Sequence, residues 1–282
     1  MRSIRPALTG KLTGLRNPVR WFCAPGQRRS VIGMHLYWDM DPNLGPLVEA
    51  SAVLEILEAP TVAKTYFWAL RASFTDNNGT DHGAAHLGLQ WYPPHPNSGA
   101  VNWGGYPPQH SNWQVTLTGS ESPLPSTTDD PNTRDYPWQV GVKYRLRIFP
   151  SPEKGWRATI TDLSTGTVDL VRDLWLGGNR VKSFIVWTEW FCGRRDPSVS
   201  VRWSEFVAID SYGVAHAPDS LLVNHPTEGF SNTSHIVEES GPHAKVLQVM
   251  KHRRKVRHGT VIPVGGSPLG LPADPFAVYL PE

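Results

Sequence analysis

The sequence predicts an all-β protein built as an antiparallel sandwich, and two observations favour this fold class. The 25 glycines and 26 prolines among 282 residues recur along the chain without a repeat period, as is typical of turns between short strands. Several segments between them alternate apolar and polar residues with the period of two that a half-buried strand requires. Many short strands joined by turns indicate a sandwich or a barrel, and one such domain can reach roughly 200–250 residues.

Two segments carry the clearest alternation. In 139–149, one face collects Val140, Val142, Tyr144, Leu146 and Ile148. In 199–209, one face collects Val201, Trp203, Val207 and Ile209, with Glu205 among them. We expect the apolar sides of these two strands to meet inside a two-layer stack.

Further strands are expected where aromatic and β-branched residues gather, because these side chains pack well on a pleated surface. These segments are 65–74, 84–92, 156–161, 167–174 and 181–191. Segment 46–58 fits neither the helical nor the strand period, and we assign it as a strand because its neighbours are strands. Residues 93–138, rich in Pro, Asn, Ser and Asp, are expected to form two large loops around a short strand near 113–117.

The chain divides into three expected regions. Residues 1–30 hold seven basic residues and no acidic one, which predicts a flexible basic arm. Residues 31–213 form the sandwich, and 214–282 form an irregular extension in which 246–249 and 261–264 could pair as a hairpin around a basic loop. The first 30 residues contain no apolar run of the kind a secretory signal needs, which favours a cytoplasmic location. The segment is explained equally well by a start codon placed too far upstream, in which case the protein itself begins near Met34.

Composition excludes several classes of protein. A hydrophobic fraction of 39% and a charged fraction of 18% are those of a globular chain, and no segment approaches the ~20 apolar residues of a membrane span. Two cysteines, Cys23 and Cys192, exclude a disulfide-rich scaffold and a cysteine-only zinc site. No phosphate-binding loop, dinucleotide fingerprint or serine-hydrolase elbow is present, so no cofactor is expected. The basic run 251–258 supplies non-specific affinity for phosphates, so no sequence-specific nucleic-acid partner is expected.

A resemblance to a known family appears in the order of elements. The hairpins expected over 138–166 resemble those of the back sheet in concanavalin A-like sandwiches. The segments YFWAL (66–70), HLGLQW (86–91) and VWTEWF (186–191) are similar to an uncharacterised bacterial family of such domains. The resemblance implies a concanavalin A-like jelly roll and, since that family is often found beside carbohydrate-binding modules, a carbohydrate ligand. It implies no catalytic residues, because none are established for the family.

A sugar site needs aromatic faces for the C–H surfaces and planar polar groups for the hydroxyls. On the expected strand 84–92, three polar side chains share one face, and on 181–191 Trp187 and Glu189 share a face. Further aromatic residues fall in or beside the expected loops. The candidate ligand contacts are therefore His86, Gln90, Tyr92, Trp103, Tyr106, Trp113, Trp187 and Glu189. The competing interpretation is that the twelve tryptophans mainly fill the core.

Acidic residues of the sequence offer two other kinds of site, a catalytic carboxylate pair and a cation site. Glu189 and Glu205 could form the carboxylate pair of a glycosidase, although the favoured interpretation is that both form ion pairs with Arg194, Arg195 or Arg202. Asp76, Asn78 and Asp81 lie on a tight turn and carry the oxygen ligands that hard cations prefer. The twelfth position of an EF-hand loop starting at Asp76 is Leu87 rather than glutamate, so no metal is expected.

Three functions follow from these patterns. The leading hypothesis is a non-catalytic, lectin-like module that binds a carbohydrate or glycan surface. The first alternative is a glycan-active hydrolase or lyase that uses Glu189 and Glu205. The second is a structural or interaction protein whose basic ends dock an acidic partner. The sequence identifies neither the ligand nor the oligomeric state.

Overall fold

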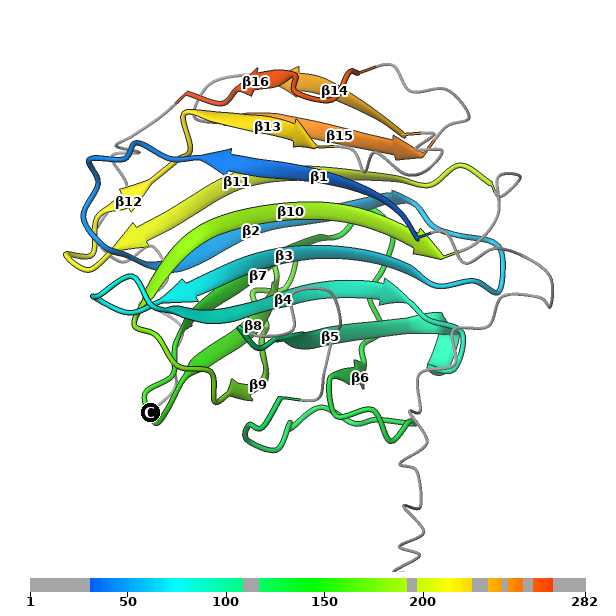
Figure 1. The fold of residues 1–282 in the computed structure, drawn as a ribbon. Helices are drawn as coiled ribbons and strands as arrows, with labels where there is room; N and C mark the ends of the chain where they lie inside the picture. Colours follow the sequence, from blue (N-terminus) through cyan, green and yellow to red (C-terminus); the bar gives the residue numbers. More distant parts are fainter. Residues whose placement is uncertain are drawn as a thin grey trace, which may run out of the picture.

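The computed structural model describes residues 31–108, 117–191, 197–224, 233–239, 243–250 and 256–265. Within these residues the chain forms strands and one short 3-10 turn, η1 (Pro96–Ser98), and the strands make two large antiparallel sheets stacked face to face (Figure 1). The predicted all-β antiparallel sandwich is confirmed. No helix in the described part of the chain is long and apolar enough to cross a membrane.

In the described part of the chain, the front sheet, which faces the viewer in Figure 1, has eight strands. In spatial order they are β16 (Val261–Pro263), β13 (Ser220–Asn224), β1 (Val31–Asp39), β10 (Arg180–Phe191), β3 (Tyr66–Thr75), β4 (Asp81–Trp91), β5 (Gly99–Tyr106) and β6 (Thr133–Asp135). Every neighbouring pair is antiparallel. The pleat therefore sends alternate side chains of each strand into the core and away from it.

The back sheet lies behind it. In spatial order its strands are β14 (Thr233–Glu239), β15 (Lys245–Met250), β11 (Ser200–Asp210), β2 (Leu47–Glu58), β7 (Lys143–Pro150), β8 (Trp156–Asp162) and β9 (Val168–Leu174), with β12 (Ala215–His216) paired to β11. The ambiguous segment 46–58 is thus a central strand, as its neighbours predicted.

Large aromatic side chains fill the space between the sheets. Trp68, Trp103, Trp156 and Trp203 are among the largest fully buried side chains, and Phe74 stacks on Trp156 with ring centroids 4.2 Å apart. Trp103 was expected in a loop as a ligand contact, but it lies on β5 and points into the core with 0% exposure. That expectation is wrong, because the glycine-rich segment 99–106 pairs with β4 as a strand.

One buried polar link joins the two sheets. The Gln248 side-chain Oε1 on β15 accepts hydrogen bonds from Thr188 Oγ1 on β10 at 2.5 Å and from Trp203 Nε1 on β11 at 2.9 Å. Gln248 is 0% exposed, so these bonds form away from water, where an unmade hydrogen bond costs most.

A β-bulge corrects the predicted faces of β11. The register with β2 shifts between Ser204 and Val207, and Glu205 adopts a left-handed φ of 49°. Val201 and Trp203 point into the core as expected, but Val207 and Ile209 form a small outer cluster with Ala215 on β12. The inserted residue reverses the alternation, so the expected single apolar face does not exist.

The start of β7 also differs from the prediction, by a few residues. Tyr144, Leu146 and Ile148 point into the core, as the alternation predicts. Residues 139–142 form a turn instead of the first part of the strand, with the Val142 amide hydrogen-bonded to the Gln139 carbonyl and Gly141 at a φ of 78°. Val140 is consequently 51% exposed.

The C-terminal region is not an irregular extension. Residues 215–263 contribute strands to both sheets: β13 pairs with β1, and β15 pairs with β11. The expected hairpin between 246–249 and 261–264 is also wrong, because β15 belongs to the back sheet and β16 to the front sheet. Residues 1–30, both cysteines and most of the basic run lie outside the described residues.

Candidate functional site

Five strands of the front sheet turn an unusual set of side chains away from the core. The residues that alternate with the core positions of these strands form what we call the outer face. They are His35 and Tyr37 on β1; Ile185, Trp187 and Glu189 on β10; Phe67, Ala69 and Arg71 on β3; His86, Gly88 and Gln90 on β4; and Asn102, Gly104 and Tyr106 on β5. An outward sheet face normally carries simple polar residues, whereas this one mixes aromatic rings with hydrogen-bonding groups.

Strand register aligns these residues in rows across the sheet. Glu189 lies opposite Phe67, which lies opposite Gln90, so the backbones of Glu189 and Gln90 are two strand spacings, ~9.5 Å, apart. In the next row, Ala69 and Gly88 carry almost no side chain between their neighbours. A Cβ atom on Gly88 would lie 2.1 Å from the Trp68 carbonyl oxygen, which requires glycine there.

Aromatic rings surround His86 at the centre of the outer face. Its ring centroid lies 5.3 Å from that of Phe67, 5.5 Å from that of Trp187 and 5.4 Å from that of Tyr106. His86, Gln90 and Trp187 are at most 4% exposed and form the floor of the face.

A second set of side chains stands above this floor and is half-buried: His35, Tyr37, Arg71, Tyr106 and Glu189. His35 Nε2 lies 3.6 Å from Glu189 Oε1, and its ring is 5.8 Å from Trp187. These residues are the first that an approaching molecule would meet.

Two polar atoms of the floor have no hydrogen-bond partner among the described residues. They are the Gln90 Oε1 acceptor and the Trp187 Nε1 donor, and both are buried. A buried polar group without a partner costs about 1–3 kcal/mol, so such groups in native proteins call for an explanation such as water, an ion or a ligand. One acceptor and one donor on the same face fit a ligand that offers both kinds of group.

Tyr106 keeps its phenol proton over the whole physiological range. Burial raises its pKa to about 12, the negative charge of Glu189 adds to the rise, and the Arg71 guanidinium opposes it. Its hydroxyl can therefore donate as well as accept a hydrogen bond.

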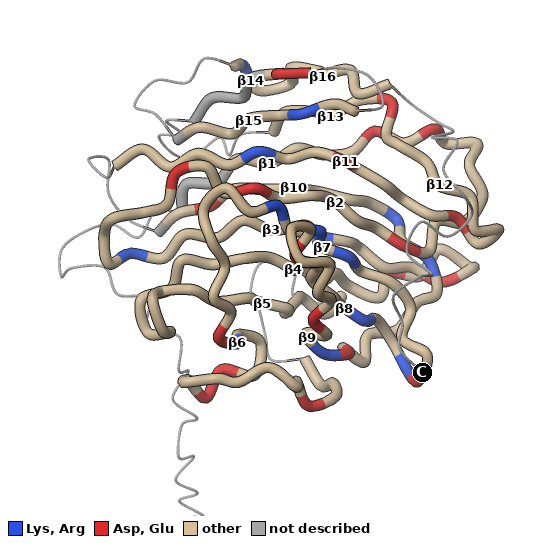
Figure 2. The backbone as a smooth tube through the Cα atoms, turned by 180° about the vertical axis from the view of Figure 1, so that it is seen from behind, with Lys and Arg blue, Asp and Glu red and all other residues tan. Residues whose placement is uncertain are grey.

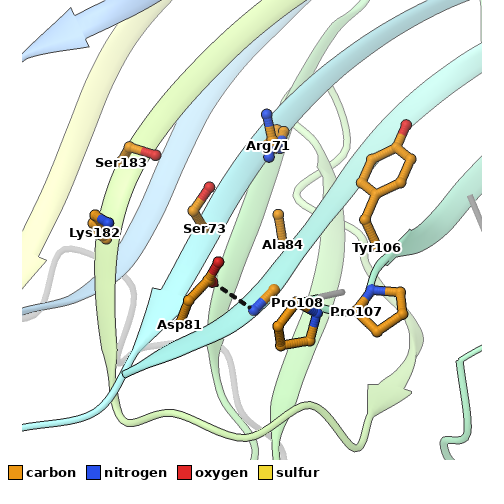
Figure 3. A pocket seen from close by; sticks show the side chains of 10 residues that line it. Arg71, Ser73, Asp81, Ala84, Tyr106, Pro107, Pro108, Lys182 and Ser183 are labelled. Atoms are coloured by element: carbon orange, nitrogen blue, oxygen red, sulfur yellow. Dashed lines mark hydrogen bonds between the residues drawn. The ribbon is translucent and has the colours of Figure 1, made fainter. Parts of the chain in front are cut away.

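A pocket of about 170 Å³ opens at the Tyr106 end of the outer face (Figure 3). Its walls come from β3, β4, β10 and the end of β5. The polar lining residues are Arg71, Ser73, Asp81, Tyr106, Lys182 and Ser183, and Pro107 and Pro108 close one side. Arg71 and Tyr106 belong both to the pocket and to the outer face, so the two features are continuous.

Glu205 does not join this site. It lies on β11, exposed on the far side of the back sheet, where it forms an ion pair with Arg145 of β7. Figure 2 shows this side of the molecule, with acidic and basic residues along β2, β7 and β11. Glu189 and Glu205 are therefore separated by the full thickness of the sandwich, and the predicted glycosidase pair is wrong.

The remaining candidates fall elsewhere. Tyr92 follows β4, and its ring centroid lies 5.2 Å from that of His95, near the β6 edge of the sheet. Burial and the negative charge of Asp130 raise the pKa of Tyr92 there. Trp113 lies outside the described residues.

The three oxygen-bearing candidates for a cation hold a turn together. Asp76 Oδ1 accepts hydrogen bonds from the amides of Asn78 and Thr80 at 2.8 and 2.9 Å, and Asp81 Oδ1 accepts one from Gly83 at 2.8 Å. No cluster of three or more metal-ligating side chains occurs among the described residues.

Sequence reasoning missed several residues of the site, among them Arg71, His35 and Tyr37. Arg71 occupies an outward position on the strongly apolar segment 66–74, and a lone cation there is a signal that could have identified it. His35 and Tyr37 alternate with Met34, Leu36 and Trp38. This period-two pattern, next to the basic N-terminal segment, is the signal that could have identified them.

No protein-family model matches this chain, and comparison with curated proteins finds no similar sequence. Solved structures with a similar fold include Scytalido-glutamic peptidase with a peptide-based transition state analog (TM-score 0.43, 10% identity, 78% of this chain and 98% of that chain covered). SCP-B, a member of the eqolisin family of peptidases in complex with the tripeptide Ala-Ile-His, has a TM-score of 0.39, at 10% identity over 78% of this chain and 98% of its own. The alginate lyase Aly36B has a TM-score of 0.27, at 14% identity over 52% and 69%. These similarities are too distant to assign an activity, so the function follows from the chain's own residues.

Proposed function

We propose that this protein is a lectin-like module that binds a carbohydrate on the outer face of its front sheet. The observation that carries the proposal is the combination of aromatic rings, planar polar groups and an adjoining pocket on one outward sheet surface. A sheet face that served only as a solvated surface would need neither the rings nor the buried amide.

The chemistry of a sugar matches these groups. Its C–H faces pack on aromatic rings, and its hydroxyls both donate and accept hydrogen bonds. A hydroxyl hydrogen could satisfy Gln90 Oε1, and a hydroxyl oxygen could accept from Trp187 Nε1, once small movements of the half-buried layer admit the ligand. Tyr106, His35 and Glu189 would supply the contacts at the surface.

The proposal favours binding over glycoside hydrolysis. Double carboxylate catalysis needs two acidic groups about 5–10 Å apart on one surface. Glu189 is the one carboxylate among the outer-face residues named above, and Glu205 lies on the opposite side of the molecule. Asp81 lines the adjoining pocket, where one of its oxygens accepts a hydrogen bond from the Gly83 amide. A binding role needs no second carboxylate.

Replacing Tyr106 with alanine tests the proposal. We expect the Tyr106→Ala variant to bind its oligosaccharide about 10-fold more weakly, a loss of ~1.4 kcal/mol, because a stacking ring and a hydroxyl donor are removed. Isothermal titration calorimetry with oligosaccharides selected on a glycan array provides the measurement. The matched control is Tyr212→Ala, which removes a tyrosine that is 80% exposed beside the β11–β12 turn and should leave affinity unchanged.

Two results would overturn the proposal. The first is a glycan array and calorimetry with no binding to any saccharide. The second is equal binding by the Tyr106→Ala variant and the Tyr212→Ala control.

A further inference from the structure

The pocket beside Tyr106 contains two cations that have no carboxylate partner. Arg71 reaches it from β3 and Lys182 from β10, and neither forms an ion pair or a side-chain hydrogen bond with any residue in the described part of the chain (Figure 3). Arg71 is half-buried and its Nε is fully buried, so water does not satisfy that donor. A partly desolvated guanidinium without a partner is costly for a fold.

The arginines of the back sheet show the contrast. Arg147 binds Glu49 through two hydrogen bonds of 2.6 and 2.9 Å, and Arg157 binds Asp173 at 2.8 and 2.9 Å. Arg202 on β11 is held between two glutamates. Arg172 on β9, which is 4% exposed, has no carboxylate partner among the described residues but donates to Asn132 Oδ1 at 2.8 Å. Arg71 has neither kind of partner in the described part of the chain and is left open to the pocket.

The surroundings of Arg71 orient it for a ligand. Its guanidinium carbon lies 5.8 Å from the centroid of the Tyr106 ring, a cation–π contact that restrains the group without using its N–H donors. The Ser73 and Ser183 hydroxyls line the same pocket. Asp81 is the one carboxylate in the lining, and one of its oxygens accepts a hydrogen bond from the Gly83 amide.

We propose that this pocket is a subsite for the anionic group, a carboxylate or a sulfate, of an acidic saccharide. The inference rests on the proposed function and names the substrate class of that site. The planar guanidinium matches the two oxygens of such a group, and the Lys182 ammonium adds a second positive charge at the rim. The neutral part of the saccharide would extend from Tyr106 over the outer face.

The test compares three tetrasaccharides of equal length by calorimetry: a neutral hexose, a hexuronate and a sulfated hexose. We expect the unmodified protein to bind one or both acidic ligands at least about 10-fold more tightly than the neutral one, and a rise in salt to reduce this preference. The Arg71→Gln variant should lose the preference, because its affinity for the acidic ligands should fall much more than its affinity for the neutral one, and Arg71→Lys should retain part of the preference. The Lys143→Gln variant, which removes an exposed lysine of the back sheet, should change nothing.

Each outcome decides a separate question. Preference for the hexuronate identifies a carboxylate, and preference for the sulfated ligand identifies a sulfate. Equal binding of the neutral and acidic ligands, or an Arg71→Gln variant that keeps the preference, overturns the subsite and leaves the proposed function standing. Absence of binding to all three ligands and to a glycan array overturns the proposed function itself.

Discussion

A chain that ends after Gly213 is expected to fail to fold. The deletion removes β13 from β1 and β15 from β11, and with them five apolar side chains larger than alanine that are at most 3% exposed. These side chains are Leu221, Val223, Val246, Ile262 and Val264. Burial of each contributes ~1.5–3 kcal/mol, so their sum is comparable with the whole ~5–15 kcal/mol that stabilises a typical domain.

Circular dichroism and urea unfolding provide the measurement. The matched control ends after Gly265 and keeps every described strand, so it should give a strand spectrum and a cooperative transition like those of the full chain. A cooperative transition of similar midpoint in the chain that ends after Gly213 would show that residues 214–265 are dispensable, contrary to the sheet pairing.

Replacing Gln248 with leucine is expected to lower the free energy of unfolding by ~2–4 kcal/mol. The change leaves the Trp203 indole N–H and the Thr188 hydroxyl without the acceptor that they share inside the core. Each buried group that loses its partner costs about 1–3 kcal/mol. Urea unfolding followed by tryptophan fluorescence gives the free energy directly.

A double-mutant cycle separates the hydrogen bonds from the packing. Replacing Trp203 with phenylalanine removes one donor, so Gln248→Leu should cost less in that background than in the natural chain. The exposed Gln139 serves as the control site, and Gln139→Leu should change stability by less than ~0.5 kcal/mol. Equal costs in both backgrounds would contradict a shared acceptor.

The sequence pattern predicted the strands far better than the faces they present. Alternation located most of the strands of both sheets, because the period of two follows from the pleat alone. It could not reveal the bulge at Glu205, since one extra residue in a strand reverses the inner and outer sides without changing composition. The pairing of β13 with β1 joins segments about 190 residues apart, which no local pattern encodes.

The candidate site was predictable in part for the same reasons. His86 and Gln90 on one strand, and Trp187 and Glu189 on another, share faces because their positions differ by an even number. Which of those faces points outward depends on the second sheet, so the sequence left a pairing of Glu189 with Glu205 open as an alternative. Trp103 was misplaced because the glycines around it conceal a strand whose backbone packs tightly against β4.

The indole N–H resonance of Trp187 tests the central claim most directly. In protein labelled with ¹⁵N-tryptophan, we expect this signal, assigned through a Trp187→Phe variant, to shift as the saccharide that binds in the array is titrated, because Nε1 gains a hydrogen-bond acceptor on the outer face. Trp175, which is 43% exposed next to Lys154 on the back-sheet side, should keep its position. A saturating titration that moves Trp175 and leaves Trp187 unchanged would place the ligand elsewhere and contradict this assignment of the binding face.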